Sequence, residues 1–210
     1  PATAASAAPT TVTHPQWSRN AVIYEVNVRQ YTPEGTFKAF ARHLPRLRDL
    51  GVDILWLMPI HPISEEGRKG TLGSYYAVRD YYGVNPEFGT MDDMCALVDS
   101  IHAYGMHVII DWVPNHTGCD NVWVKTHPEY YARNAKGEMY GPYDWTDVYK
   151  LDYKNPATRR AMTDAMAFWL KKAGIDGFRC DVAMEVPTDY WNEARIELQR
   201  ICPDLFMLAE

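Results

Sequence analysis

A repeated pattern of helix, glycine and apolar strand constrains the fold of this 210-residue chain more than any other feature. Gly51, Gly105 and Gly174 each follow a segment with helical spacing and precede a run of apolar residues. Glycine ends a helix readily because it adopts the left-handed conformation without a steric penalty. Helices that alternate with continuous apolar strands are typical of βα units, and right-handed crossovers between such strands give a parallel sheet.

The positions of the individual elements follow from this pattern. Continuous apolar runs indicate buried strands, and apolar residues at helical spacing indicate the helices that cover them. The expected strands are residues 21–28, 52–58, 106–113, 175–181 and 205–210. The expected helices are residues 37–50, 91–104, 157–173 and 190–201, and Pro45 interrupts the first of them.

Two connections between the expected elements are long. Residues 59–90 form a loop rich in Gly, Tyr and Pro. Residues 117–155 exceed the length of an ordinary connection between a strand and a helix. We interpret 117–155 as a small inserted subdomain over the mouth of the sheet, whose main part is formed by residues 17–116 and 156–210.

An open doubly wound sheet and a closed (β/α)8 barrel both fit this alternation. No GxGxxG or P-loop segment follows a strand, which weakens the case for a nucleotide-binding open sheet. A closed barrel usually needs about 250 residues. Because the fifth expected strand ends at Glu210, the last residue, we expect about the first five βα units of a TIM barrel, as part of a larger protein.

Composition excludes several classes of protein. The net charge of -6 argues against a nucleic-acid partner, and no stretch approaches the roughly 20 apolar residues of a membrane span. The four cysteines form no CxxC pair and do not indicate the redox compartment. Residues 1–14 carry no Lys, Arg, Asp or Glu and are rich in Ala, Thr, Ser and Pro, which predicts a flexible leader up to residue 16. This leader weakly favours a secreted or periplasmic protein.

Three consecutive expected strands carry an acid at or near the carboxyl end: Asp111, Asp181 and Glu210. Active sites of parallel α/β folds gather at these strand ends. Arg179 lies two residues before Asp181, so the two side chains share a face of the strand and Arg179 can hold the carboxylate ionised. A structural Arg–Asp pair is the alternative. Paired carboxylates beside an Arg and a nearby His favour glycosyl transfer chemistry, since no zinc-type cluster, nucleophile elbow or strand-end Lys is present in the sequence.

Five segments carry a resemblance to a known family. Residues 111–116 (DWVPNH) resemble the DxxxNH motif of the α-amylase family of glycoside hydrolases, and 177–181 (GFRCD) resemble its GxRxD nucleophile motif. Residues 208–210 (LAE) resemble the strand end that carries its general acid. Residues 73–81 (GSYYAVRDY) resemble the stretch with its sugar-stacking tyrosine, and 85–90 (NPEFGT) follow as usual. The order and spacing of the segments agree over nearly the whole chain.

The resemblance implies a role for each acid. Asp181 would attack the anomeric carbon to form a covalent glycosyl intermediate, and Glu210 would protonate the leaving oxygen and later activate water. A retaining mechanism needs carboxyl groups about 5–5.5 Å apart, which neighbouring strands about 4.8 Å apart can supply. Arg179 would keep Asp181 ionised, whereas Glu210 would need a raised pKa.

The resemblance also implies substrate contacts. Tyr76 would stack on a sugar ring, and Asp111 and His116 would bind sugar hydroxyls beside Arg179. The alternatives are that Asp111 orients Arg179, that the His116 ring is satisfied by backbone, and that Tyr76 only packs. Asp80 is expected to order its loop.

The chain departs from the family pattern at two places. Many members hold a calcium ion, and Asn115 matches one of its ligands, but Lys150 aligns with an acidic one. Met184-Glu185 stands where amylases commonly have Lys-His. We therefore expect no metal ion at that place and no cofactor, because calcium needs several oxygen ligands. The missing Lys-His pair puts the usual leaving-group contacts in doubt.

The leading hypothesis is a retaining hydrolase of α-1,4-linked maltooligosaccharides or starch. A transglycosylase, an α-1,6-glucosidase and a non-catalytic carbohydrate-binding or scaffold member of the family are alternatives. An unrelated barrel lyase or aldolase is disfavoured. The family's third acid lies beyond Glu210, so we expect the 210-residue chain alone to be inactive.

Overall fold

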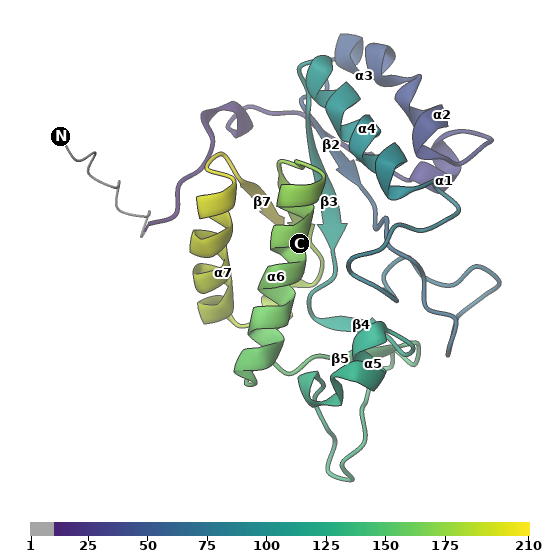
Figure 1. Ribbon diagram of the computed structural model, residues 1–210, viewed down its shortest axis with the longest axis vertical. Coiled ribbons are helices and arrows are strands. Elements are labelled where there is room, and N and C mark those ends of the chain that lie inside the picture. The colour runs from purple at the N-terminus through teal and green to yellow at the C-terminus, as the bar shows by residue number, and fades with distance from the viewer. Residues whose placement is uncertain (1–10) are drawn as a thin grey trace.

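Five parallel strands form the central sheet of the computed structural model, which describes residues 11–210 (Figure 1). The strand order is β1-β2-β3-β6-β7, so neighbours in the sheet follow one another along the chain and β1 and β7 form its edges. This is the expected set of five βα units. The strands are β1 (Ile23–Val26), β2 (Ile54–Leu57), β3 (His107–Trp112), β6 (Gly177–Cys180) and β7 (Phe206–Ala209).

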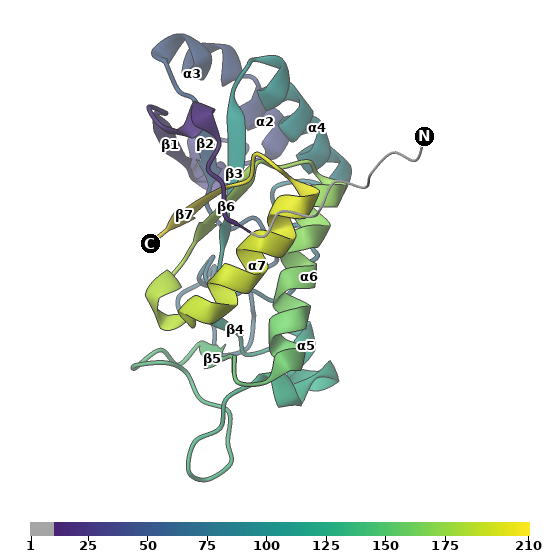
Figure 2. The ribbon, with the colours of Figure 1, turned by 90° about the vertical axis from the view of Figure 1, so that its left-hand side faces the viewer.

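Helices cover one side of this sheet, and α6 and α7 lie side by side there (Figure 2). The helices of the barrel part are α1 (Val28–Tyr31), α2 (Phe37–Ala41), α3 (Leu44–Leu50), α4 (Met91–Ala103), α6 (Pro156–Lys172) and α7 (Thr188–Ile201). Short 3-10 helices are η1 (Gln16–Ser18), η2 (Pro128–Tyr130) and η3 (Ala183–Glu185).

The helix expected at 37–50 is two helices, α2 and α3. Pro45 lies in the first turn of α3, where a backbone N–H would have no partner within the helix. The proline therefore costs no helical hydrogen bond there. Gly51 ends α3 in the left-handed conformation, and its N–H donates to the Arg48 carbonyl. The break that Pro45 predicts is therefore present, just before the proline.

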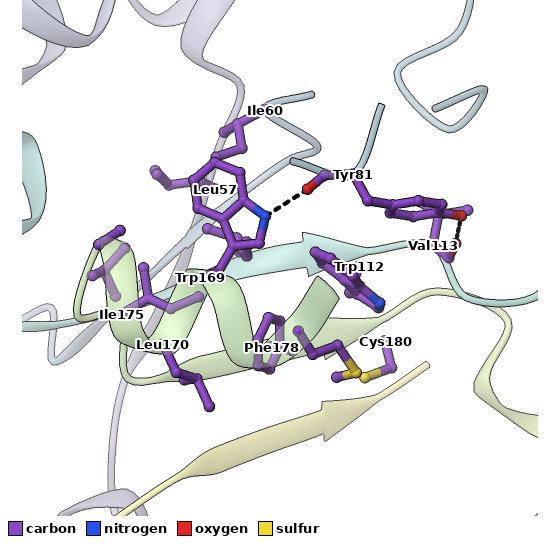
Figure 3. Close-up of a cluster of buried hydrophobic side chains, with 14 of the residues drawn as sticks. Leu57, Ile60, Tyr81, Trp112, Val113, Trp169, Leu170, Ile175, Phe178 and Cys180 are labelled. Atoms are coloured by element: carbon purple, nitrogen blue, oxygen red, sulfur yellow. Dashed lines mark hydrogen bonds between the residues drawn. The ribbon is translucent and has the colours of Figure 1, made fainter. Parts of the chain in front are cut away.

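The core between the sheet and α6 fixes the long loop 59–90 to the end of β3 (Figure 3). Trp112 of β3 and Phe178 of β6 pack edge to face, with ring centroids 5.4 Å apart. The Trp169 indole N–H donates to the Tyr81 carbonyl at 2.7 Å, and the Tyr81 hydroxyl donates to the Val113 carbonyl at 2.6 Å. The loop that carries Tyr81 is therefore held at the carboxyl end of the sheet.

The strand register sets which residues meet on the other face of the sheet. Asp111 of β3 pairs directly with Arg179 of β6, so both side chains point away from the helix-side core. Cys180 of β6 pairs with Ala209 of β7. Asp181 follows Cys180, and Glu210 follows Ala209. Both acids therefore lie at the same edge of the sheet.

The segment after β3 contains a second, two-stranded sheet. Strand β4 (His116–Gly118) pairs antiparallel with β5 (Val148–Lys150), and α5 (Val122–Thr126) lies between them in sequence. Figure 1 shows this segment beyond the carboxyl end of β3. It thus lies next to the edge of the sheet at which Asp181 and Glu210 emerge.

The expected leader covers residues 1–16, and residues 1–10 lie outside the described part of the chain. Next to it, the Thr13 N–H donates to the Gln199 side chain at 2.8 Å, and Arg195 donates to the Thr13 carbonyl at 2.8 Å. Trp17 then stacks on His107 with ring centroids 3.7 Å apart. Thr13 is thus bound to α7 where the sequence led us to expect flexible chain. None of the helices in residues 11–210 combines the length and apolar character that a membrane crossing requires.

Replacement of Gly177 by alanine tests the pairing of β6 with β7. A Cβ atom at Gly177 would collide with the backbone carbonyl of Phe206 on β7, so Gly177→Ala should lower the free energy of unfolding by about 3 kcal/mol or more. Gly174→Ala is the matched control, because a Cβ there meets no atom within 4 Å and should cost only about 1 to 2 kcal/mol for its left-handed backbone. Urea unfolding measures both, and equal losses would contradict the clash.

Candidate active site

One guanidinium group binds three carboxylates at the carboxyl ends of β3, β6 and β7. Arg179 Nη1 lies 2.9 Å from Asp111 Oδ1 and 3.1 Å from Asp181 Oδ1. Arg179 Nη2 lies 3.1 Å from Glu210 Oε1. Asp111 and Asp181 are buried, whereas the Glu210 side chain is 48% exposed. The structure therefore brings together the three acids and the arginine that the sequence singled out.

Asp111 is held by two further donors besides Arg179. The Trp56 indole N–H and the Tyr76 hydroxyl both donate to Asp111 Oδ2 at 3.0 Å. The Arg179 guanidinium lies over the Trp56 ring, 4.7 Å from its centroid, in a cation–π arrangement. Despite these partners, burial raises the pKa of Asp111 to about 6. The expected alternative role of Asp111, to orient Arg179, agrees with these contacts.

The backbone of Val182, the residue after Asp181, contacts Glu210. It adopts a left-handed conformation with φ 48°, which is uncommon for a β-branched residue. In this conformation its N–H donates to Glu210 Oε2 at 2.9 Å. Strained backbone of this kind clusters at functional sites, where surrounding contacts hold it in place.

The protonation preferences of the two acids are the reverse of those expected from the sequence. Burial, followed by the neighbouring Glu210 and Asp111, raises the pKa of Asp181 to about 7, even though Arg179 opposes this shift. The Val182 N–H lowers the pKa of Glu210, which is half exposed to water. A single cation shared by three acids does not offset the burial of Asp181. The prediction that Arg179 keeps Asp181 ionised, while Glu210 has a raised pKa, is therefore wrong.

His116 is buried in β4 beside the same site. Burial lowers its pKa to about 4, so the imidazole is neutral near pH 7. Its ring lies edge to face with Trp145 at 5.3 Å, and its Nδ1 lies 3.4 Å from the Asn115 side-chain nitrogen. A neutral ring can both donate and accept a hydrogen bond, as a sugar hydroxyl requires.

A cavity of about 560 Å³ joins these groups. Tyr76, His116, Asp181 and Glu210 all line it, and Asp111 lies behind Tyr76. Ligand sites of this size combine aromatic walls with a few placed polar groups. The cavity can therefore accept a small polar ring between Tyr76 and the two acids.

The loop 59–90 and the inserted segment also contribute groups that the sequence reasoning missed. Trp145 lines the cavity, and Lys69 Nζ lies 3.6 Å from Asp147 Oδ1 across it. Trp56 supports Asp111 from β2. Trp56 pairs with Ile109, and Ile109 shares a strand face with Asp111 because the two are two residues apart. Trp56 therefore lies on the same face of the sheet as Asp111, which is a signal that could have identified it.

The residues at the expected calcium position do not suit that ion. In residues 11–210, no three His, Cys, Asp or Glu side chains lie close enough to hold a metal ion. Lys150 pairs with His116 between β5 and β4, so an ammonium group occupies the place of an acidic ligand. Calcium requires 6–8 oxygen ligands, and the ammonium group of Lys150 cannot serve as one of them.

Comparison with known proteins shows which family this chain resembles. The family model described as the alpha amylase catalytic domain matches residues 13–149 and 130–205. The chain is 34% identical over 207 residues to a trehalose synthase from Pimelobacter sp. (strain R48), which covers 80% of this chain and 35% of that relative. It is 29% identical to alpha-amylase 3 from Dictyoglomus thermophilum, covering 92% of this chain and 44% of the relative.

Solved structures agree with this result. An alpha-amylase from Lactobacillus plantarum matches 91% of this chain with 46% identity and a TM-score of 0.88. A noncanonic maltogenic alpha-amylase from Thermotoga neapolitana matches 92% of it with 40% identity and a TM-score of 0.87. The chain spans between 35% and 46% of the length of these four relatives.

Replacement of Asp181 by asparagine should stabilise the protein at neutral pH. Because the folded state raises the pKa of Asp181 from 3.8 to about 7, the stability that this group contributes is present below about pH 4 and is lost as the pH rises through 7. Asp181→Asn removes this loss, so the free energy of unfolding at about pH 8 should rise by about 1 to 2 kcal/mol. The gain should vanish near pH 4.

Urea unfolding across this pH range measures the effect. The exposed Asp204 in the turn before β7 provides the matched control, since Asp204→Asn should change stability little at any pH. A variant of Asp181 that is no more stable than the wild type at about pH 8 would contradict the raised pKa.

Proposed function

This chain belongs to the α-amylase family, as the N-terminal portion of its catalytic domain, and we propose that it carries the nucleophile and the acid of a retaining enzyme that acts on α-1,4-linked glucans. Asp181 would attack the anomeric carbon and form a covalent β-glycosyl ester. Glu210 would donate a proton to the leaving oxygen and then remove one from the incoming water. The observation that carries the proposal is the binding of both carboxylates to adjacent nitrogens of Arg179.

Bound glucan would set the protonation states that this reaction needs. Asp181 and Glu210 interact closely, so they titrate as a pair rather than independently. A sugar chain over the cavity would remove water from the half-exposed Glu210, and this desolvation would raise its pKa. A proton shared by the pair would then reside on Glu210, leaving Asp181 charged beside Arg179.

The cavity walls support binding of a glucose unit. Tyr76 would stack on the ring bound by Asp181, and its hydroxyl is already fixed by Asp111. The neutral His116 would exchange hydrogen bonds with a sugar hydroxyl. Asp111 would act mainly by positioning Arg179 and Tyr76.

A transglycosylase is the second candidate. The curated relatives include proteins named trehalose synthase and alpha-1,4-glucan:maltose-1-phosphate maltosyltransferase, at 34% and 32% identity. Both reaction types would use the same covalent intermediate and differ in the acceptor that removes the sugar. An α-1,6-glucosidase would also use it. Product analysis with maltoheptaose and with a branched glucan separates these activities. A non-catalytic member is disfavoured because both acids are present and lie at one guanidinium.

Trapping of the intermediate tests the nucleophile. Incubation of the full-length protein that carries this chain with a fluorinated glycosyl donor that has a good leaving group should add one glycosyl mass to the peptide with Asp181. The fluorine slows both steps, and the good leaving group restores formation of the ester but not its hydrolysis. Asp181→Asn should abolish the adduct, and Asp204→Asn should leave it unchanged. Labelling of another residue, or no labelling in an active preparation, would contradict the assignment.

The 210-residue chain alone should release no measurable reducing sugar from maltooligosaccharides. It covers less than half of the length of the relatives described above. A reducing-sugar assay with the purified chain, beside the full-length protein as positive control, measures this. Release above the level of the Asp181→Asn variant would overturn the expectation.

A further inference from the structure

One wall of the cavity has no part in the proposed reaction at the anomeric carbon. Since the Val182 N–H binds Glu210, the residues that follow Val182 lie on the side of the proposed acid, where the leaving group would be. These residues form η3, which ends at Glu185. Tyr76 lies beside Asp111, to which its hydroxyl donates a hydrogen bond.

Tyr143, from the inserted segment, reaches η3 across the cavity mouth. Its hydroxyl donates to Glu185 Oε1 at 2.6 Å. Its side chain is 67% exposed and its backbone has φ 53°, an uncommon conformation for a bulky residue. An exposed side chain in such a conformation needs contacts that hold it, and the bond to Glu185 and the neighbouring Trp145 ring at 5.1 Å supply them.

Lys150 adds a charged contact to the same group. Lys150 Nζ lies 3.8 Å from Glu185 Oε2, and Lys150 belongs to β5 of the inserted segment. The two positions at which the sequence departs from the family pattern, Lys150 and Met184-Glu185, are therefore neighbours in space. The inserted segment supplies Tyr143 and Lys150, and the barrel supplies the carboxylate that binds both.

Exposed apolar side chains are concentrated at this wall. Tyr143 and Met184 are the two most exposed large hydrophobic residues in residues 11–210, at 67% and 75%, and both line the cavity. Exposed apolar groups gathered at one cleft mark a binding surface. A sugar ring is apolar on its faces and polar at its edges, so an aromatic ring beside an apolar chain matches it.

We propose that Tyr143, positioned by Glu185 and Lys150, is the surface on which the leaving-group sugar of an α-glucan stacks. This inference rests on the proposed function and deepens it by naming a leaving-group contact supplied by the inserted segment. Tyr143 touches the substrate, whereas Glu185 and Lys150 are positioning residues. Without the carboxylate of Glu185, the Tyr143 ring loses the contact that holds it over the cleft.

Two donors that differ only in the leaving group test this proposal in the full-length protein. Maltotetraose requires a sugar on the leaving-group side, whereas α-maltosyl fluoride releases only a fluoride ion. Tyr143→Ala should lower kcat/KM for maltotetraose by roughly tenfold. For α-maltosyl fluoride, measured as fluoride release, kcat/KM should stay within about twofold of the wild-type value.

Variants of Glu185 test its positioning role. Glu185→Ala removes the acceptor for the Tyr143 hydroxyl and should reproduce the Tyr143→Ala pattern, mainly as a higher KM for maltotetraose. Glu185→Gln keeps an acceptor oxygen and should restore most of the lost kcat/KM. Tyr140→Ala is the matched control, because Tyr140 lies in the same segment but does not line the cavity, and it should change neither donor.

The outcomes separate this inference from the proposed function. An equal loss of kcat/KM on both donors in Tyr143→Ala, or no loss on either, would overturn the inference while the wild type remains active. Failure of Glu185→Gln to rescue would overturn the positioning role. A full-length wild type that consumes neither donor would overturn the proposed function itself, and the inference with it.

Discussion

The contact of Arg179 with Asp111, Asp181 and Glu210 is the interaction on which the rest of the site depends. Two of these acids are buried, and a buried acid is costly unless a partner holds it. The arginine can bind all three only if β3, β6 and β7 lie in the observed parallel register. Trp56 supports the guanidinium from β2. Side chains on or just after four adjacent strands thus meet at one guanidinium, and a change in any register would leave a buried charge without its partner.

One cation among three acids also leaves the site short of positive charge. Burial raises the pKa of Asp181, whereas the Val182 N–H lowers the pKa of the exposed Glu210. The proposed reaction needs the opposite distribution, which desolvation by bound glucan would supply. Buried acids that resist ionisation cost stability, and this is a common consequence of preparing a protein for catalysis.

The inserted segment completes the cavity that the barrel strands begin. His116 enters it from β4, and Trp145 lies against that ring. Tyr143 and Lys150 return to the barrel at Glu185, next to the proposed acid. The inserted segment thus contacts the barrel both near His116 and at Glu185. In the proposed arrangement it can place Tyr143 on the leaving-group side without altering the acids.

The sequence by itself determined the order of the βα units, the interruption near Pro45, and the convergence of acids at three strand ends. These features depend on local periodicity and on the rule that parallel strands share one carboxyl edge, so they can be derived without coordinates. The tertiary structure alone decided which acid keeps a proton and that Tyr143 meets Glu185. Both depend on burial and on contacts between segments far apart in the chain, and no local pattern encodes the exposed fraction of Glu210 or the path of the inserted segment.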